Sequence, residues 1–400
     1  METIIRKEYL DRIKKYIDAP VIKVIIGARR VGKTYFMKQI MDVLKQSTAD
    51  ENMLFINKED LAWEFITDYT VLHQYIQDYF GKTSGKRYIF IDEIQDISLW
   101  ENCIRSLHSE EIYDIYISGS NSRLLSSELS TYLTGRFIEF RIYPLCFREF
   151  LIFRGNDNSK EEFENYMKYG WLPAIHKMNF EDEIIYSYLG WVFSTIIFKD
   201  IISRYNIRNS GLLLDIMKFL SDNIGNIFSA KKISDYLKNQ KIPISVDSLR
   251  EYLQYFENTF LLAKVHRFDI RGKNLLEIYE KYYLGDIGFR SYLLGFRQNN
   301  IGQVLENIVY NELLVRWYSV QIGKIWDLEI DFIAEKNGER KYFQVTYLLS
   351  HPEVVDREFK PLTKVNDNYE KVVLSMDEYF TKDIEWIKRL HLVDWLLEGG

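Results

Sequence analysis

The sequence predicts an α/β protein made of several domains, and three patterns support this prediction. Short β-branched runs alternate with helical spacing over residues 1–155, and a glycine-rich loop joins the first run to the first helix. A helical stretch, a group of three short helices with a hairpin, and a second alternation of helix and strand follow. A chain of 400 residues is also too long for one core, since domains of about 100 to 200 residues are typical.

The first domain, residues 1–155, is expected to hold a parallel sheet flanked by helices. Its first strand is the apolar run V-I-K-V-I-I at Val21–Ile26, and helical spacing follows over Lys33–Leu44. Helical patterns separate most of the later strands, which is typical of parallel sheets. Those strands are expected at Met53–Asn57, Tyr88–Ile91, Ile112–Ile117 and Phe137–Arg141.

The rest of the chain divides into three further predicted domains. Aromatic residues at helical spacing make residues 156–209 a helical lid. Residues 210–296 contain three short helices, two of them opened by a serine in N-cap position, and then a hairpin, which is the pattern of a winged-helix module. Residues 297–400 return to a helix followed by alternating strands, which predicts a small α/β domain.

Composition narrows the classes of protein that this chain can represent. With 52 Lys and Arg against 58 Asp and Glu, the net charge of -6 creates no overall attraction to nucleic acid or to an anionic membrane. Cys103 and Cys146 are too few for a disulfide framework and lack metal-ligand spacing. The charged N-terminus is not a signal peptide, and no run reaches the roughly 18 apolar residues of a spanning helix. We therefore expect a cytoplasmic protein without membrane contact.

The loop Gly27–Thr34 reads G-A-R-R-V-G-K-T and lies between a predicted strand and a predicted helix. Glycines allow the backbone to curl so that its N–H groups converge on phosphates, a lysine contacts the outer phosphates, and a threonine hydroxyl binds magnesium. This pattern predicts ATP with Mg²⁺ as ligands. Contacts to the nucleotide are expected from Gly27, Ala28, Arg29, Arg30, Val31, Gly32, Lys33, Thr34 and Tyr35.

The segment Tyr88–Glu93 reads Y-I-F-I-D-E, an apolar strand that ends in two carboxylates. Beside a phosphate loop, such a pair predicts a metal ligand and a base for the attacking water. We expect Thr34 and Asp92 to hold magnesium, the latter through water, and Glu93 to orient or deprotonate the attacking water. Lys33 is expected to supply positive charge to the outer phosphates.

Further motifs follow the phosphate loop and the acidic pair in a fixed order along the chain. They are F-I-D-E-I-Q at Phe90–Gln95, I-S-G-S-N-S at Ile117–Ser122, L-T-G-R-F at Leu133–Phe137, Y-P-L-C-F-R-E-F at Tyr143–Phe150 and K-Y-Y-L-G-D-I-G at Lys281–Gly288. In this order the chain resembles prokaryotic AAA-type ATPases related to the STAND branch of signalling NTPases. These proteins carry a C-terminal domain of restriction-nuclease-like fold, and the resemblance covers nearly the whole chain.

The resemblance implies three further catalytic candidates. Ser118 and Asn121 follow the fourth strand, where such ATPases carry a polar sensor of the terminal phosphate, although an ordinary helix N-cap would explain them equally well. Arg136 could contact the terminal phosphate, or it could form a structural ion pair with an acid such as Glu139.

The two C-terminal domains point only weakly to nucleic acid. The wing of the winged helix is basic and could touch a phosphate backbone through Lys264, Arg267, Arg271 and Lys273. In the last domain, Glu306, Asp331, Gln344 and Thr346 fall in the order of a PD-(D/E)XK nuclease site. Because a glutamine replaces a carboxylate and a threonine replaces the lysine, we expect a degenerate site with little or no nuclease activity.

The function predicted from these observations is ATP binding and hydrolysis by a molecular switch or remodelling ATPase with a protein partner. Two alternatives remain open: an ATP-regulated DNA-binding protein or nuclease, and an ATP-binding scaffold with negligible turnover. The sequence fixes neither the oligomeric state nor whether a neighbouring chain supplies an arginine to the site.

Overall fold

The computed structural model describes residues 4–122, 135–156, 159–242, 244–297, 300–378 and 386–398. The chain divides into two compact units, Met1–Ile142 and Tyr143–Gly400. The predicted domain boundaries after residues 155, 209 and 296 remain predictions. Of the quoted motifs, Leu133 and Thr134 in L-T-G-R-F lie outside the described residues.

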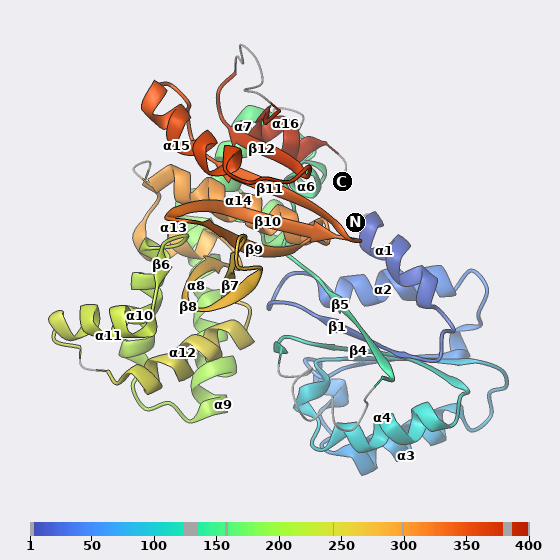
Figure 1. Cartoon of the computed structure of the whole chain (residues 1–400). Helices are drawn as coiled ribbons and strands as arrows, with labels where there is room; N and C mark the ends of the chain where they lie inside the picture. Colours follow the sequence, from blue (N-terminus) through green and yellow to red (C-terminus); the bar gives the residue numbers. More distant parts are fainter. Residues whose placement is uncertain are drawn as a thin grey trace. The chain divides into compact units, whose positions relative to one another are not determined.

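The first unit contains the predicted parallel sheet, which is confirmed. Its strands lie in the order β2-β3-β4-β1-β5, and all the neighbouring pairs are parallel. Helices α1 and α2 cover one face, and α3 and α4 cover the other (Figure 1). The strands are β1 (Ile22–Ile26), β2 (Met53–Asn57), β3 (Arg87–Asp92), β4 (Tyr113–Gly119) and β5 (Phe137–Arg141), and the helices are α1 (Lys7–Ile13), α2 (Lys33–Leu44), α3 (Tyr69–Phe80) and α4 (Trp100–Ser109).

Burial explains why the central strands contain apolar runs. Each residue of β1 and β4 is buried, as expected for strands covered by helices on both faces. Lys23 is a charged residue in the otherwise apolar strand β1. It forms an ion pair with Asp114 of β4, and its Nζ donates to the Ala19 carbonyl oxygen at 3.1 Å. Burial lowers the pKa of Lys23, while Asp114 opposes that shift. A charge in the sheet is tolerated here because it is paired and hydrogen-bonded.

The second unit begins with a helical stretch that covers the predicted lid. It consists of α6 (Phe147–Arg154), α7 (Ser159–Tyr169), a 3₁₀ turn at Pro173–Lys177 and α8 (Asp182–Thr195), which continues through a π-helical segment (Ile196–Ile202) into α9 (Ser203–Tyr205). By length and composition, the helix Asp182–Tyr205 could cross a membrane, with a mean hydropathy of 1.2. Half of the apolar window of this helix is buried. The ring of Phe193 packs on that of Phe289 in α13 (Gly288–Leu294), with 5.8 Å between the ring centres. These contacts are those of a helix in the core of the second unit. The cytoplasmic location remains a prediction.

The remaining elements of the second unit follow the predicted order of helices, hairpin, helix and strands. The helices are α10 (Ser210–Asp222), α11 (Ala230–Asn239), α12 (Val246–Asn258), α14 (Ile301–Val315), α15 (Pro352–Thr363) and α16 (Leu392–Leu397). The strands are β6 (Ile227–Phe228), β7 (Leu262–Asp269), β8 (Asn274–Leu284), β9 (Ser319–Ile325), β10 (Leu328–Lys336), β11 (Glu339–Val345), β12 (Glu370–Ser375) and β13 (Lys388–His391).

One sheet runs through most of the second unit. Its described strands lie in the order β13-β12-β11-β10-β9-β7-β8-β6, so the hairpin β7–β8 and the C-terminal strands belong to the same sheet. The junction is a parallel pairing of β7 with β9, in which Arg267 faces Ile322 and Asp269 faces Lys324. The hairpin that was predicted as a wing therefore has a strand along one side.

Candidate functional site

The candidate nucleotide site lies at the carboxyl edge of the parallel sheet. Strand β1 runs into the phosphate loop, β3 ends at Asp92, and β4 ends at Gly119. Because β4 lies between β1 and β3 in the sheet, the residues that follow these three strands come together at one edge. This edge is where ligands bind in open parallel sheets.

The phosphate loop depends on two glycine positions. Gly32 has a φ of 99° and immediately precedes α2, a conformation that costs other residues free energy. A Cβ at Gly27 would lie 2.3 Å from the carbonyl oxygen of Ile142, so a side chain at that position is excluded. Lys33 is buried, and its Nζ donates to the carbonyl oxygens of Gly27 at 3.1 Å and Ala28 at 3.2 Å. The loop therefore curls around the ammonium of its own lysine.

Asp92 and Thr34, the two predicted magnesium ligands, are in contact. The Thr34 hydroxyl donates to Asp92 Oδ2 at 2.5 Å, and the Ser118 hydroxyl donates to Asp92 Oδ1. Burial raises the pKa of Asp92, and the two hydroxyl groups oppose that shift. A hydroxyl and a carboxylate are suitable hard ligands for Mg²⁺, which usually takes its other oxygens from water and phosphates. Among the described residues, no group of three or more His, Cys, Asp or Glu could hold a metal ion by itself.

Both carboxylate oxygens of Glu93 have partners: one lies near a lysine, and the other accepts two hydrogen bonds. Its Oε1 lies 3.4 Å from Lys33 Nζ, and its Oε2 accepts from the Ser120 hydroxyl at 2.8 Å and from the Gln95 side-chain amide. Burial alone would raise the pKa of Glu93, but Lys33, the two hydrogen bonds and the charge of Arg29 lower it to about 2. Glu93 also has a φ of 52°, a strained conformation of the kind often found at functional sites. The carboxylate is therefore ionised and able to accept a proton.

The structure brings Ser118 to this site. The Ser118 hydroxyl donates to Asp92 and accepts from the backbone N–H of Glu93 at 3.2 Å. Asn121 is buried, two residues after the end of β4. Ser120 and Gln95 bind Glu93 and were not predicted, although Ser120 is adjacent to Asn121 and Gln95 lies two residues after Glu93.

Arg136 is not brought to this edge. It is exposed and precedes β5, and its carbonyl oxygen accepts from the N–H of Ile22 at the start of β1. The phosphate loop leaves β1 at the other end, where Ile26 pairs with Arg141. Four residue steps of strand, roughly 13 Å, separate the two ends. This geometry gives no support to a contact between Arg136 and a phosphate bound by its own unit.

The other residues of the phosphate loop differ in exposure. Val31 is fully buried beneath the loop, whereas Tyr35 on α2 is 57% exposed. Arg30 is exposed and has a φ of 69°. Arg29 is buried, and its Nη1 lies 2.6 Å from Glu59 Oε1 in the segment that follows β2. The two adjacent arginines therefore occupy different environments.

The predicted nuclease residues of the second unit meet around a buried lysine. Lys281 of β8 places its Nζ 2.8 Å from Glu306, 2.7 Å from Glu329 and 3.9 Å from Asp331, and Tyr283 donates a further hydrogen bond to Glu306. Burial would lower the pKa of Lys281, but these carboxylates raise it well above its usual value. The ammonium therefore lies among the acids that a nuclease would use to bind metal and offsets part of their negative charge.

Gln344 lies beside this cluster, whereas Thr346 is buried and its backbone N–H donates to the Leu374 carbonyl oxygen at 3.0 Å. The Gln344 side-chain oxygen accepts from the backbone N–H of Asp331 at 3.4 Å, and Asp331 Oδ2 accepts from the N–H of Val345 at 2.8 Å. Burial raises the pKa of Asp331, and the nearby Glu306 adds to the shift. The sequence order of Glu306, Asp331 and Gln344 thus corresponds to residues that lie together. Lys281, Tyr283 and Glu329 belong to the same cluster and were not predicted.

Two of the four basic wing residues have partners within the unit. Lys264 pairs with Glu280 at 2.7 Å, and the guanidinium of Arg271 lies 3.6 Å from the ring centre of Trp326. Arg267 lies in the stretch of β7 that pairs with β9. Lys273 is exposed and lies in the turn of the hairpin. Of these four charges, that of Lys264 is offset by an acid.

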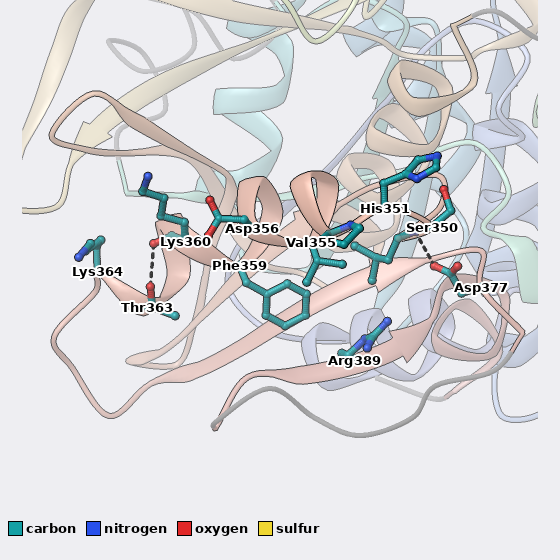
Figure 2. Close-up of a pocket in the computed structure, with 12 residues that line it drawn as sticks. Ser350, His351, Val355, Asp356, Phe359, Lys360, Thr363, Lys364, Asp377 and Arg389 are labelled. Carbon is teal, nitrogen blue, oxygen red and sulfur yellow. Dashed lines mark hydrogen bonds between the residues drawn. The ribbon is translucent and has the colours of Figure 1, made fainter.

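A cavity of about 890 Å³ lies along α15 in the second unit. Phe359 of α15 and Arg389 of β13 line it, and Asp377 accepts from the backbone N–H of Leu349 at 2.9 Å (Figure 2). The cavity contains none of the predicted site residues.

Comparison with known proteins agrees with the geometry of the first unit. Residues 20–151 match a family described as an AAA domain, and residues 160–300 match a domain of unknown function (DUF8612). An uncharacterized protein of Haemophilus influenzae is 36% identical over 400 residues, 99% of each chain. An uncharacterized protein of Methanocaldococcus jannaschii is 31% identical over 392 residues, 90% of this chain and 83% of the other.

Among solved structures, one match is the Aeropyrum pernix ORC1 protein in complex with DNA, with 11% identity and a TM-score of 0.35. The match covers 73% of this chain and 92% of that chain. This similarity is too low to assign a fold or a function.

The parallel sheet, the phosphate loop and the acidic pair define the first unit as an AAA-type P-loop domain. The whole chain belongs to one family with the uncharacterized proteins of H. influenzae and M. jannaschii.

Proposed function

We propose that the AAA domain binds ATP with Mg²⁺ and hydrolyses it, and that the protein is a molecular switch or remodelling ATPase. The observation that carries this proposal is the arrangement around the acidic pair. Asp92 contacts the Thr34 hydroxyl, while Glu93 is ionised beside Lys33. A metal ligand and a base are thus available at the mouth of one phosphate loop.

Each residue has a separate part in the proposed mechanism. The Lys33 ammonium contacts two carbonyl oxygens of the loop and the Glu93 carboxylate. On ATP binding it would contact the outer phosphates instead. Thr34 and Asp92 would hold Mg²⁺, which neutralises phosphate charge. Ser118 fixes the Asp92 carboxylate, and Ser120 with Gln95 fixes Glu93, so that Glu93 can orient the attacking water and accept its proton.

We further propose that the segments 156–209, 210–296 and 297–400 act as lid, winged helix and degenerate nuclease-like domain. They would transmit the nucleotide state to a protein partner. The alternative of an ATP-regulated nuclease has little support, because Gln344 and Thr346 stand where a carboxylate and a lysine are expected and Lys281 lies between Glu306 and Asp331. DNA binding through the wing is weakened by the ion pair of Lys264 with Glu280.

The test is steady-state ATP hydrolysis by the full chain and two variants. Lys33→Ala should abolish both tight ATP binding and turnover, whereas Glu93→Gln should still bind ATP but hydrolyse it about 10²- to 10⁴-fold more slowly. Matched controls are Lys45→Ala, at the end of the same α2, and Glu110→Gln, an exposed acid after α4. Turnover by Glu93→Gln at the wild-type rate would contradict the mechanism, and binding without turnover by the wild type would favour a scaffold.

A further inference from the structure

Arg29 is an unusual residue in the phosphate loop because it is long, charged and buried. Only 6% of its surface is exposed, although its neighbour Arg30 is exposed. Burying a guanidinium is costly unless an acid or another acceptor compensates for it. One acid that compensates for it here is Glu59, whose Oε1 lies 2.6 Å from Arg29 Nη1.

The Glu59 end of this ion pair lies at the rim of the site. Its side chain is 37% exposed, and it follows β2, whose last residue Asn57 pairs with Asp92. The N–H of Lys58 donates to the Asp92 carbonyl oxygen at 3.2 Å. The segment after β2, which contains Glu59, is therefore hydrogen-bonded to the end of β3, where Asp92 and Glu93 lie.

The same loop carries the cation that contacts the acidic pair. The Nζ of Lys33 lies 3.4 Å from Glu93 Oε1. Arg29 lies four residues before Lys33, and both residues are buried. The loop that would bind the phosphates therefore carries two buried cations.

We propose that Arg29 is a catalytic residue: on ATP binding its guanidinium leaves Glu59 and contacts the terminal phosphate. This inference rests on the proposed ATPase function. The oxygen of water bonds to the terminal phosphorus while the bond from that phosphorus to the bridging oxygen breaks. ADP keeps the electron pair of that bond, and Glu93 accepts the proton from water. The planar guanidinium stabilises the charge spread over the phosphoryl oxygens.

A purely structural ion pair is the competing explanation. In that case Arg29 would only fasten the loop to the segment after β2, and either half of the pair would be equally important. If Arg29 is catalytic, only the arginine is needed, because Glu59 competes with the phosphate for the guanidinium. The two explanations therefore predict opposite effects for substitution of Glu59.

The experiment measures kcat and the Kd for ATP, with Mg²⁺, for the full chain and for Arg29→Ala, Arg29→Lys and Glu59→Gln. Arg29→Ala should lower kcat roughly 10²- to 10³-fold with a much smaller change in Kd. Arg29→Lys should recover part of this loss because it keeps the charge but not the planar fork. Glu59→Gln should keep or raise kcat.

The proposal is overturned if Arg29→Ala turns over at the wild-type rate, or if Glu59→Gln loses as much kcat as Arg29→Ala. Thermal melting checks that each variant is folded. Should Arg29→Ala fail to fold, Arg29→Lys and Glu59→Gln decide the question by the same criteria. An absence of hydrolysis by the wild type would instead overturn the proposed function, so the two failures are distinguishable.

Discussion

Gly27 has the least spatial freedom of the residues in the phosphate loop. A methyl group there would lie 2.3 Å from the Ile142 carbonyl oxygen, which belongs to the backbone and cannot turn away. Gly27→Ala should therefore displace the loop, lower the stability of the first unit by roughly 1 to 3 kcal/mol and weaken ATP binding.

Thermal melting and ATP titration of Gly27→Ala check this prediction. Gly81→Ala is a matched control in the same unit, because its nearest contact would be an ordinary 3.4 Å and its φ is -58°. Normal stability and affinity in Gly27→Ala would show that the loop can relax around the extra carbon.

Much of the site could be predicted because its chemistry is local in sequence. Gly27–Thr34 and Asp92–Glu93 are contiguous motifs whose flanking strands are apolar and β-branched. Ser120 and Gln95 were not predicted, because their contacts with Glu93 depend on side-chain direction after the strand ends. The position of Arg136 depends on the register of β5 against β1, which neither segment encodes alone.

At the scale of single elements, the 3₁₀ turn after α7 packs the partly buried His176 among aromatic rings. Its ring lies 4.5 Å from Phe150 and 5.9 Å from Phe153. Burial, assisted by the charge of Arg154, lowers the pKa of His176 to about 3. The imidazole is therefore neutral in the folded protein at pH values where an unfolded histidine is protonated.

His176 predicts a loss of stability in acid. Between its usual pKa and about 3 the unfolded chain binds one more proton, so the free energy of unfolding falls as the pH decreases, by at most about 1.4 kcal/mol per pH unit. Urea unfolding of the wild type and of His176→Phe across this range provides the measurement. The variant should lose less stability, and equal pH dependence of the two proteins would contradict the assignment.

Strand β8 makes a second prediction at this scale. Lys281→Met leaves Glu306, Glu329 and Asp331 without their cation, which should lower the stability by about 3 to 5 kcal/mol. Buried acids without a cation have raised pKa values and hold protons on folding, so the loss should increase from about pH 5 to about pH 8.

Urea unfolding at the two pH values checks the prediction for Lys281→Met. Lys264→Met is the control, since its pair with Glu280 is partly exposed and worth about 0 to 1 kcal/mol. An equal or smaller loss at the higher pH would contradict the prediction, because it would mean that the buried acids of the variant bind no extra protons on folding.

At the scale of the whole molecule, the large sheet crosses the predicted boundary at residue 296. Strands β7 and β8 precede that boundary and β9 follows it, yet β7 pairs with β9. We expect the chain 143–400 to fold cooperatively. A fragment 297–400 should not, because it exposes the edge of β9 and leaves Glu306 and Asp331 without Lys281.

Circular dichroism and urea unfolding of the two fragments test this expectation. The sequence predicted strands and helices on both sides of residue 296 because those patterns are local. The sequence could not indicate that the strands on the two sides form one sheet. A parallel pairing between β7 and β9 leaves no periodic signal in either strand. A fragment 297–400 that folds independently would contradict this expectation and support a domain boundary at residue 296.

The position of Lys281 also affects how the protein responds to chelating agents. Its ammonium is a covalent part of the chain, so the counter-ion of the second unit cannot be extracted by EDTA. Under the proposed function, removal of free magnesium would stop ATP hydrolysis in the first unit, while the acids of the larger sheet would keep their cation.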